Sequence, residues 1–206
     1  MSYRTHRTIS CRLLQVAAPQ QGIALIEVLV SLVILLFGLL GLMGVSSRSS
    51  MAEMESYQRI QALQLVQDMS DRLNANRKVA ACYSNGATGV QLGTGNTGVA
   101  SCAAGNAQQQ ARAVADLTAW DNMLKGQSEI QAGSKLGAMV GAIGCVTLDD
   151  PASNIYMIAV SWQGLVKTAA PTLADGTTAF PCGSGAYSDE KLHRVVTTKV
   201  RIGALS

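Results

Sequence analysis

GIALIEVLVSLVILLFGLLGLMGV, residues 22–45, is the stretch that decides the fold of this chain of 206 residues. The 23 residues that follow Gly22 include only two with polar side chains, Glu27 and Ser31. At a rise of about 1.5 Å per residue, a helix of this length extends about 34 Å, enough to cross the apolar core of a bilayer. We therefore predict a membrane-spanning helix at 23–45.

The charges around this run predict its orientation. Arg4, Arg7 and Arg12 precede it, and residues 1–22 contain no acidic residue. Cationic residues stay on the cytoplasmic side, so the part of the chain after the helix is expected to be exported. Without residues 1–22 the chain has 13 basic residues (16 minus 3) and 13 acidic ones, a formal charge of zero. A nucleic-acid partner is not expected, because sequence-independent binding needs a basic surface.

Residues 1–22 differ from an ordinary secretory signal peptide, in which the cleavage site follows the apolar segment. Here the segment is basic and polar, and it ends in Ala-Pro-Gln-Gln-Gly before the apolar run begins. Cleavage after Gly22 would remove the leader 1–22 and keep the helix as an anchor. Ile23 would then be the new amino terminus.

Glu27 is the most informative residue of the helix. A carboxylate inside a membrane costs about 2.5–3.5 kcal/mol on insertion scales, so such groups usually have a partner. The amino group of a new terminus at Ile23, four residues away, could neutralise Glu27 in the same chain or in a neighbour. Alternatively, Glu27 is an acid in the first part of a helix that complements the helix dipole. The residues alone leave both interpretations open.

Gly22 followed by IALIEVLVSLVILLFGLLGL resembles the class III signal of type IV pilins and pseudopilins. In that family a glycine precedes the cleavage site, and a glutamate is the fifth residue after it. The resemblance implies cleavage after Gly22 by a prepilin peptidase and N-methylation of Ile23, a position where phenylalanine or methionine is usual. It also implies that Glu27 pairs with the terminal amine of an adjacent subunit during assembly.

Residues 46–78 are predicted to continue the same helix in an amphipathic form. No proline occurs between Ile23 and Lys78, and the whole helix of about 55 residues would be about 80 Å long. Its apolar positions are mostly three or four residues apart, and we expect this half to pack along a globular domain. The positions are Met51, Met54, Leu63, Val66, Met69 and Leu73.

The remaining segment, 79–206, is predicted to be a globular domain of the α+β class. Residues 83–105 are rich in small and polar residues and indicate a loop, and a helix capped by Asn106 is expected at 108–125. Alternating patterns predict strands at 139–148, 155–162 and 196–202. One long N-terminal helix packed on a small antiparallel sheet is the type IV pilin-like architecture. The segments 57–77, 113–120, 144–146, 160–164 and 194–196 further resemble the minor pilin PilV family.

Four cysteines remain after the leader, which contains Cys11. An even set in an exported domain predicts two disulfides, for which the sequence allows three connectivities. We prefer Cys82–Cys102, because this bond would restrict the loop between them, together with Cys145–Cys182, which joins a strand to the loop before the last strand. A zinc site is the competing interpretation, but there is no close CxxC pair and only one histidine after the leader.

No constellation of residues predicts catalysis or a cofactor. His193 is interpreted as a strand-surface residue, and Asp149-Asp-Pro151 as a turn that ends a strand. The glycine-rich GTGNTG at 93–98 has no lysine and lies inside the predicted loop, so it is not expected to bind phosphate. Trp120 and Trp162 are predicted to be core residues. The chain is therefore not expected to be an enzyme.

The resemblance implies a minor pilin of the PilV type, a structural component that primes pilus assembly and enters the pilus or its tip. Its expected partners are other minor pilins, the major pilin, the prepilin peptidase and the inner-membrane assembly platform. The protein would cross the inner membrane once, with residues 1–22 in the cytoplasm and 79–206 in the periplasm, and would become extracellular in the assembled pilus. Alternatives are a type II secretion pseudopilin and a minor pilin whose loop 83–105 binds a ligand such as DNA.

Overall fold

The computed structural model describes residues 23–96, 98–126, 130–131, 134–135 and 139–203. The chain divides into two compact units, residues 1–48 and 49–206. Helix α1, Ile23–Ala75, begins in the first unit and ends in the second. Its continuity agrees with the absence of proline, and side-chain pairs one turn apart support its last turns. These pairs are Gln67–Asp71 (2.9 Å) and Arg72–Asp68 (2.6 Å).

The second unit contains a four-stranded antiparallel sheet in the order β1-β4-β5-β6. Its strands are β1 (Val90–Gly93), β4 (Val140–Asp150), β5 (Ile155–Gln163) and β6 (His193–Arg201). A two-residue hairpin of β2 (Ile130–Gln131) and β3 (Ser134–Lys135) forms a separate sheet. The long N-terminal helix and this sheet give an α+β fold, as predicted.

Helix α3, Ala107–Leu124, has a reciprocal cap at its start. The Asn106 side chain accepts a hydrogen bond from the Gln109 N–H (2.9 Å), and the Gln109 side chain accepts one from the Asn106 N–H (3.1 Å). Such a capping box satisfies two backbone donors that the helix cannot bond internally. The predicted cap is confirmed, and the predicted bounds of the helix are one residue too late at each end.

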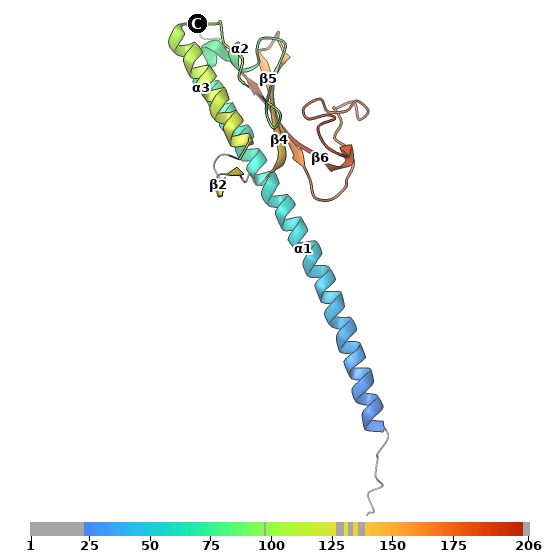
Figure 1. The fold of residues 1–206 in the computed structure, drawn as a ribbon. Helices are drawn as coiled ribbons and strands as arrows, with labels where there is room; N and C mark the ends of the chain where they lie inside the picture. The colour runs from blue at the N-terminus through green and yellow to red at the C-terminus, as the bar shows by residue number, and fades with distance from the viewer. Residues whose placement is uncertain (1–22, 97, 127–129, 132–133, 136–138, 204–206) are drawn as a thin grey trace, which may run out of the picture. The chain divides into compact units, whose positions relative to one another are not determined.

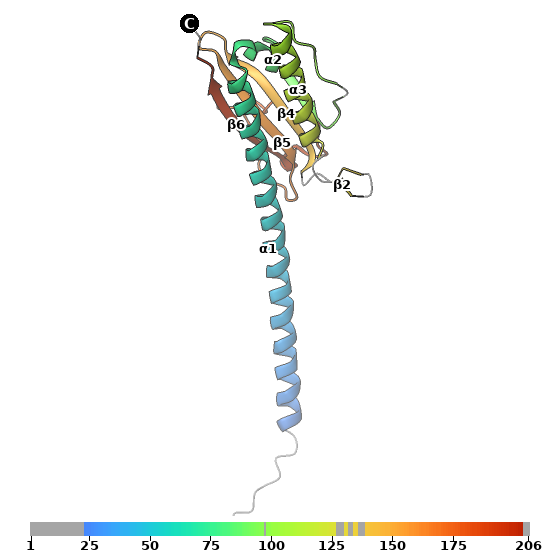
Figure 2. The ribbon, with the colours of Figure 1, turned by 90° about the vertical axis from the view of Figure 1, so that its left-hand side faces the viewer.

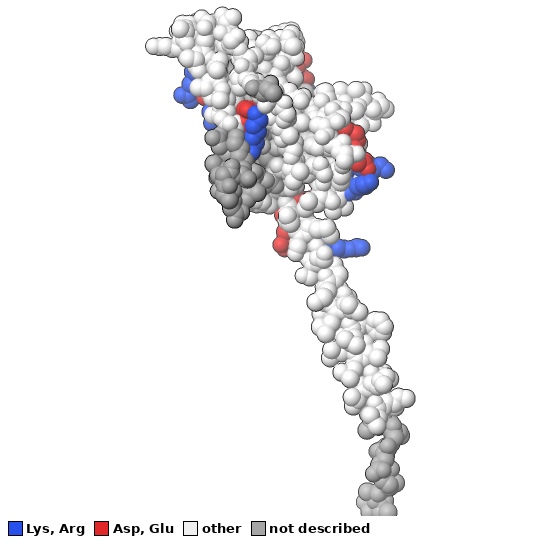
Figure 3. Space-filling model, viewed as in Figure 1, with Lys and Arg blue, Asp and Glu red and all other residues white. Residues whose placement is uncertain are grey.

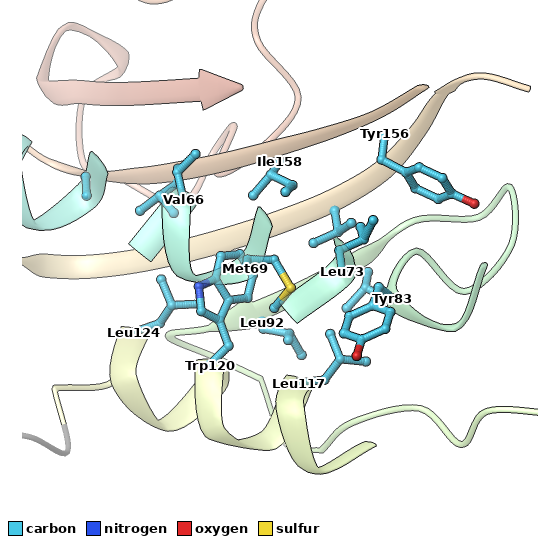
Figure 4. Packing of buried hydrophobic residues seen from close by; sticks show 14 of the residues in the cluster. Val66, Met69, Leu73, Tyr83, Leu92, Leu117, Trp120, Leu124, Tyr156 and Ile158 are labelled. Atoms are coloured by element: carbon cyan, nitrogen blue, oxygen red, sulfur yellow. The ribbon is translucent and has the colours of Figure 1, made fainter. Parts of the chain in front are cut away.

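The helices of the second unit pack on one face of the sheet, with α1 and α3 side by side (Figure 2). Their buried side chains meet those of β5 in a single core, in which Trp120 is fully buried (Figure 4). The Trp120 indole donates a hydrogen bond to the Leu65 carbonyl (2.9 Å) and so links α3 to α1. The main contributors are Val66, Met69 and Leu73 of α1, Leu117, Trp120 and Leu124 of α3, and Tyr156, Ile158, Val160 and Trp162 of β5.

Gly144 in β4 allows α3 to approach the sheet. A Cβ atom at this position would overlap the ring of Trp120 and the end of Leu124. Because both side chains lie in a close-packed core, neither can move away cheaply. A glycine is therefore required at the point of contact between helix and strand.

The opposite face of the sheet carries a smaller apolar cluster under the segment 164–192. Ile143, Cys145 and Ala159 of the sheet contact Phe180 and Cys182 of this segment. The start of the segment is held by Glu55 of α1, whose carboxylate accepts hydrogen bonds from the Leu165 and Val166 N–H groups (both 3.0 Å). Arg194 of β6 contacts the same carboxylate (3.3 Å). The segment is therefore fixed to α1 at its start and to the sheet at Phe180 and Cys182.

Three expectations about secondary structure and packing are corrected. Residues 83–105 are not entirely loop, because Val90–Gly93 pairs with β4 as strand β1. Tyr83 is the last residue of the short helix α2, Ala80–Tyr83. This helix follows the 3-10 turn η1, Arg77–Val79. On α1, only the last three predicted apolar positions are buried; Met51, Met54 and Leu63 are exposed. His193 is buried, not on the strand surface.

Candidate functional site

The largest exposed apolar surface of the described residues lies on the first part of α1. All 16 large apolar side chains from Leu25 to Val45 are at least 40% exposed. In the view of Figure 3 nearly all of this helix surface is uncharged. By length and composition the helix could span a membrane, which is consistent with a single-pass membrane protein.

The balance of transfer energies favours insertion despite the acid. Fifteen of these 16 side chains are Leu, Ile, Phe or Val, the other being Met43. Each of the fifteen contributes about 0.3–0.6 kcal/mol at the centre of a membrane helix, so together they contribute roughly 4.5–9 kcal/mol. One carboxylate opposes this with about 2.5–3.5 kcal/mol. The helix therefore tolerates Glu27, but the cost of that residue is a large fraction of the gain.

Glu27 stands out within this surface because its carboxylate has no hydrogen-bond or ion-pair partner among the described residues. Its side chain is exposed, and only its backbone carbonyl is engaged, accepting a hydrogen bond from the Ser31 hydroxyl (2.7 Å). This contact satisfies Ser31 within the helix, a common arrangement for serine in apolar helices. Glu27 is thus the one polar side chain of the run that needs an external partner.

The two residues of the predicted processing site are outside or at the limit of the described chain. Gly22 lies outside the described residues, and Ile23 is the first residue of α1. Four residues separate Ile23 from Glu27, a rise of about 6 Å along the helix. An amino group at Ile23 would therefore be about one turn from the carboxylate.

Gly38, Gly41 and Gly44 give this part of α1 room for a close neighbour. A Cβ atom at any of the three would meet nothing within 4 Å. Packing within the first unit therefore does not require glycine there. Small residues of this kind allow two helices in lipid to approach closely.

The structure contains both preferred disulfides. Cys82 of α2 is bonded to Cys102 in the loop before α3, with a Cα–Cα distance of 5.1 Å. Cys145 of β4 is bonded to Cys182 in the segment before β6, with a Cα–Cα distance of 5.9 Å. The second bond is buried in the smaller apolar cluster, so it ties the 164–192 segment to the sheet.

Asp116 of α3 is a buried carboxylate that the sequence analysis did not single out. Its side chain is 4% exposed and accepts hydrogen bonds from the Tyr83 hydroxyl (2.6 Å), Arg72 (3.1 Å) and Arg112 (3.0 Å). Burial and the hydrogen bond to this carboxylate raise the pKa of Tyr83. The cluster joins α1, α2 and α3, which is a structural role. The i, i+4 spacing of Arg112 and Asp116 was its only signal in the sequence.

A second carboxylate, Asp121, contacts Gly93 and Asn96 of the glycine-rich loop. It accepts hydrogen bonds from the Gly93 N–H (2.7 Å), the Asn96 amide (3.0 Å) and Lys125 (2.6 Å). Burial raises the pKa of Asp121, but the hydrogen bonds from Lys125, Asn96 and Gly93 outweigh it and hold the pKa below its ordinary value. Two donors of this loop, the Gly93 N–H and the Asn96 amide, are thus occupied by a carboxylate of the protein itself.

His193 lies in a buried polar cluster behind β6. Its Nδ1 is 3.0 Å from Glu190, and its ring is 5.1 Å from that of Tyr187. The Tyr187 hydroxyl donates to Ser161 (3.0 Å) or to the Gly141 carbonyl (3.2 Å). The position was mispredicted because the segment that covers it, 183–192, has no periodic pattern. Among the described residues, no group of three or more His, Cys, Asp or Glu side chains is placed to hold a metal ion.

Comparison of the chain with protein-family models, with curated proteins and with solved structures gave no match. The site with the most distinctive chemistry is the first part of α1. It combines an apolar surface with one carboxylate that lacks a partner within the described chain.

Proposed function

We propose that the chain is a minor pilin of a type IV pilus, with a structural role in pilus assembly and no catalytic one. The observation that carries the proposal is Glu27, a carboxylate without a partner among the described residues, on an exposed and predominantly apolar helix surface. A lone buried charge in lipid is costly, so a second group that neutralises it is strongly favoured. The resemblance of residues 22–42 to the class III prepilin signal supplies that group, the amine of a processed terminus at Ile23.

In this proposal the prepilin peptidase removes residues 1–22, and the helix then anchors the protein in the inner membrane with its globular domain in the periplasm. The exposed apolar side chains pack on helices of other minor pilins and of the major pilin when the assembly platform moves the chain out of the bilayer. Since lipid and neighbouring helices are similarly apolar, this exchange costs little in hydrophobic energy. Pairing of Glu27 with the amine of an adjacent subunit would align the helices.

The second unit supports an extracytoplasmic location. Two disulfides persist in oxidising compartments and are rare in the cytoplasm. The α+β arrangement, with the end of α1 packed on an antiparallel sheet, is the one expected from the resemblance. In a pilus this unit would be on the outside of the filament.

Replacement Glu27→Ala tests the proposal. We expect the variant to insert into the membrane at least as well as the native chain, because an unfavourable group of about 2.5–3.5 kcal/mol is removed. Pilus formation should fall sharply, as counted by electron microscopy and by the amount of pilin in sheared fractions. The matched control is Ser31→Ala, which removes the other polar side chain of the run and should leave piliation unchanged.

Two results would contradict the proposal. One is normal piliation in the Glu27→Ala strain. The other comes from mass spectrometry of the mature chain: an amino terminus other than Ile23 in cells that contain the peptidase would remove the proposed partner of Glu27.

A further inference from the structure

An open cavity of about 480 Å³ lies where α1 ends and the ends of β5 and β6 meet. Three segments distant in the sequence line it. They are the turn after α1 with the start of α2, the turn between β4 and β5, and the residues after β6. Its polar side chains are Arg77, Lys78, Asn154 and Tyr156, and its apolar lining includes Ala80 and Ile202.

The cavity is cationic. Arg77 and Lys78 are exposed neighbours, and neither side chain has a hydrogen bond or an ion pair with a described residue. No acidic side chain lines the cavity. By contrast, the other basic side chains of the second unit include several paired ones, such as Lys125, Lys167 and Lys199. Two formal positive charges are therefore left uncompensated at one opening.

Tyr156 supplies a neutral donor to the same space. The residue is only 4% exposed, yet it lines the cavity, and its hydroxyl has no partner among the described residues. In Figure 4 the hydroxyl points away from Leu73 and Ile158, out of the core. Burial raises the pKa of Tyr156, so its hydroxyl keeps its proton and can donate. The hydroxyl therefore faces the cavity as a free donor, at the edge of the buried ring.

The Asn154 amide is the remaining donor. It belongs to the tight turn between β4 and β5, where Asn154 has a positive φ of 51°. Its backbone carbonyl accepts a hydrogen bond from the Ile202 N–H (3.0 Å), which fixes the turn against the end of β6. The side-chain amide has no partner among the described residues. Four donor groups thus line one opening, two from the turn after α1 and two from the β4–β5 turn and the start of β5.

We propose that this cavity binds a tetrahedral oxyanion with two negative charges, of the class of inorganic phosphate or a phosphate monoester. Two cationic side chains match a dianion in charge, whereas a carboxylate or a phosphodiester would leave one positive charge over. A guanidinium group binds such an anion through two parallel hydrogen bonds, and an ammonium group adds a point charge. The volume is in the range of small-molecule sites and leaves room for a small organic group on the phosphate.

The inference does not depend on the pilin proposal, because the cavity lies wholly within residues 77–203 of the second unit. It is tested by isothermal titration calorimetry of the full-length chain in a neutral detergent. The titrants are inorganic phosphate, glycerol 3-phosphate, dimethyl phosphate and acetate at equal ionic strength. The pH is set above the second pKa of both inorganic phosphate and the monoester, which for a monoester is about 6, so that the first two titrants are dianions. We expect saturable one-site binding of the two dianions, at least about tenfold tighter than of the two monoanions.

Variants assign the binding to this cavity. The double replacement Arg77→Gln with Lys78→Gln should weaken phosphate binding at least about tenfold, and Tyr156→Phe by about threefold to tenfold. The control is Lys167→Gln, an exposed lysine paired with Asp189 outside the cavity. It should bind phosphate as the native chain does.

Each alternative result overturns the proposal. Absence of saturable binding of both dianions would remove the site, and equal affinity for dimethyl phosphate would remove the preference for a dianion. Native affinity in the Arg77→Gln/Lys78→Gln chain would place any binding elsewhere. Circular dichroism of each variant checks that its fold is native, and Tyr156→Phe, which keeps the buried ring, remains informative if the double variant does not fold.

Discussion

Replacement Asp116→Asn should destabilise the second unit by about 2.5–4 kcal/mol, because one buried carboxylate holds three helices together. The change keeps the size of the side chain and removes its charge. The loss comes mainly from the hydrogen bond with the Tyr83 hydroxyl (2.6 Å), about 1.5–3 kcal/mol for a bond to a charged group in a buried site. The ion pair with Arg72, whose side chain is 23% exposed, adds about 1 kcal/mol.

Arg112 adds little to this estimate although its bonds to Asp116 are short. Its side chain is 65% exposed, so solvent screens the pair, and exposed pairs contribute about 0–1 kcal/mol. The main term can be isolated by a double-mutant cycle with Tyr83→Phe. If the two residues interact as their distance indicates, the coupling energy should be about 1 kcal/mol or more.

The assay is unfolding in urea of the full chain in a neutral detergent, followed by tryptophan fluorescence. Trp120 and Trp162 are both buried, so their emission reports loss of the core. Asp71→Asn is the matched control: this acid on the same bundle is exposed and bonded only to Gln67 (2.9 Å), so its loss should cost less than about 0.5 kcal/mol. Equal stability of Asp116→Asn and Asp71→Asn, or additive effects of Asp116→Asn and Tyr83→Phe, would refute the reasoning.

Two further predictions concern stability. Replacing both Cys145 and Cys182 by Ala should lower the free energy of unfolding by about 4 kcal/mol, since the bond closes a loop of 37 residues in the unfolded chain; unchanged unfolding in urea would contradict this. Burial raises the pKa of Tyr187 from 10.0 to about 12. Between these values the tyrosine ionises in the unfolded chain but stays protonated in the folded one. Its contribution to the free energy of unfolding is therefore complete below about pH 10 and is lost as the pH rises towards about 12. Tyr187→Phe should therefore show a shallower loss of stability over this window, and an identical pH profile in the two proteins would disprove the assignment.

The elements with strong periodicity could be predicted from the sequence. Helix α1 follows from an apolar run without proline, α3 from its cap and apolar face, and β4, β5 and β6 from their alternating residues. Strand β1 could not be predicted, since its four residues lie among glycines and are stabilised by pairing with Ile143–Val146 of β4. A pairing partner 50 or more residues away leaves no local signal.

The candidate sites divide in the same way. Glu27 is conspicuous in the sequence because an acid in an apolar run is rare, whatever the tertiary structure. Asp116, Asp121 and Tyr187 obtain their partners from other elements, so only the fold reveals their burial. His193 was misplaced for this reason: it begins strand β6, but Glu190 and Tyr187 of the preceding segment enclose it.

The contact between Glu55 and the start of segment 164–192 also has a mechanical consequence. Glu55 of α1 binds the Leu165 and Val166 amides and Arg194 of β6. A force applied to α1 from its amino-terminal side would therefore be transmitted to these residues through Glu55. Ten residues further along, the Leu65 carbonyl holds the Trp120 indole of α3. Such a force would thus be shared between the edge strand β6 and helix α3 before it reached the Cys82–Cys102 disulfide.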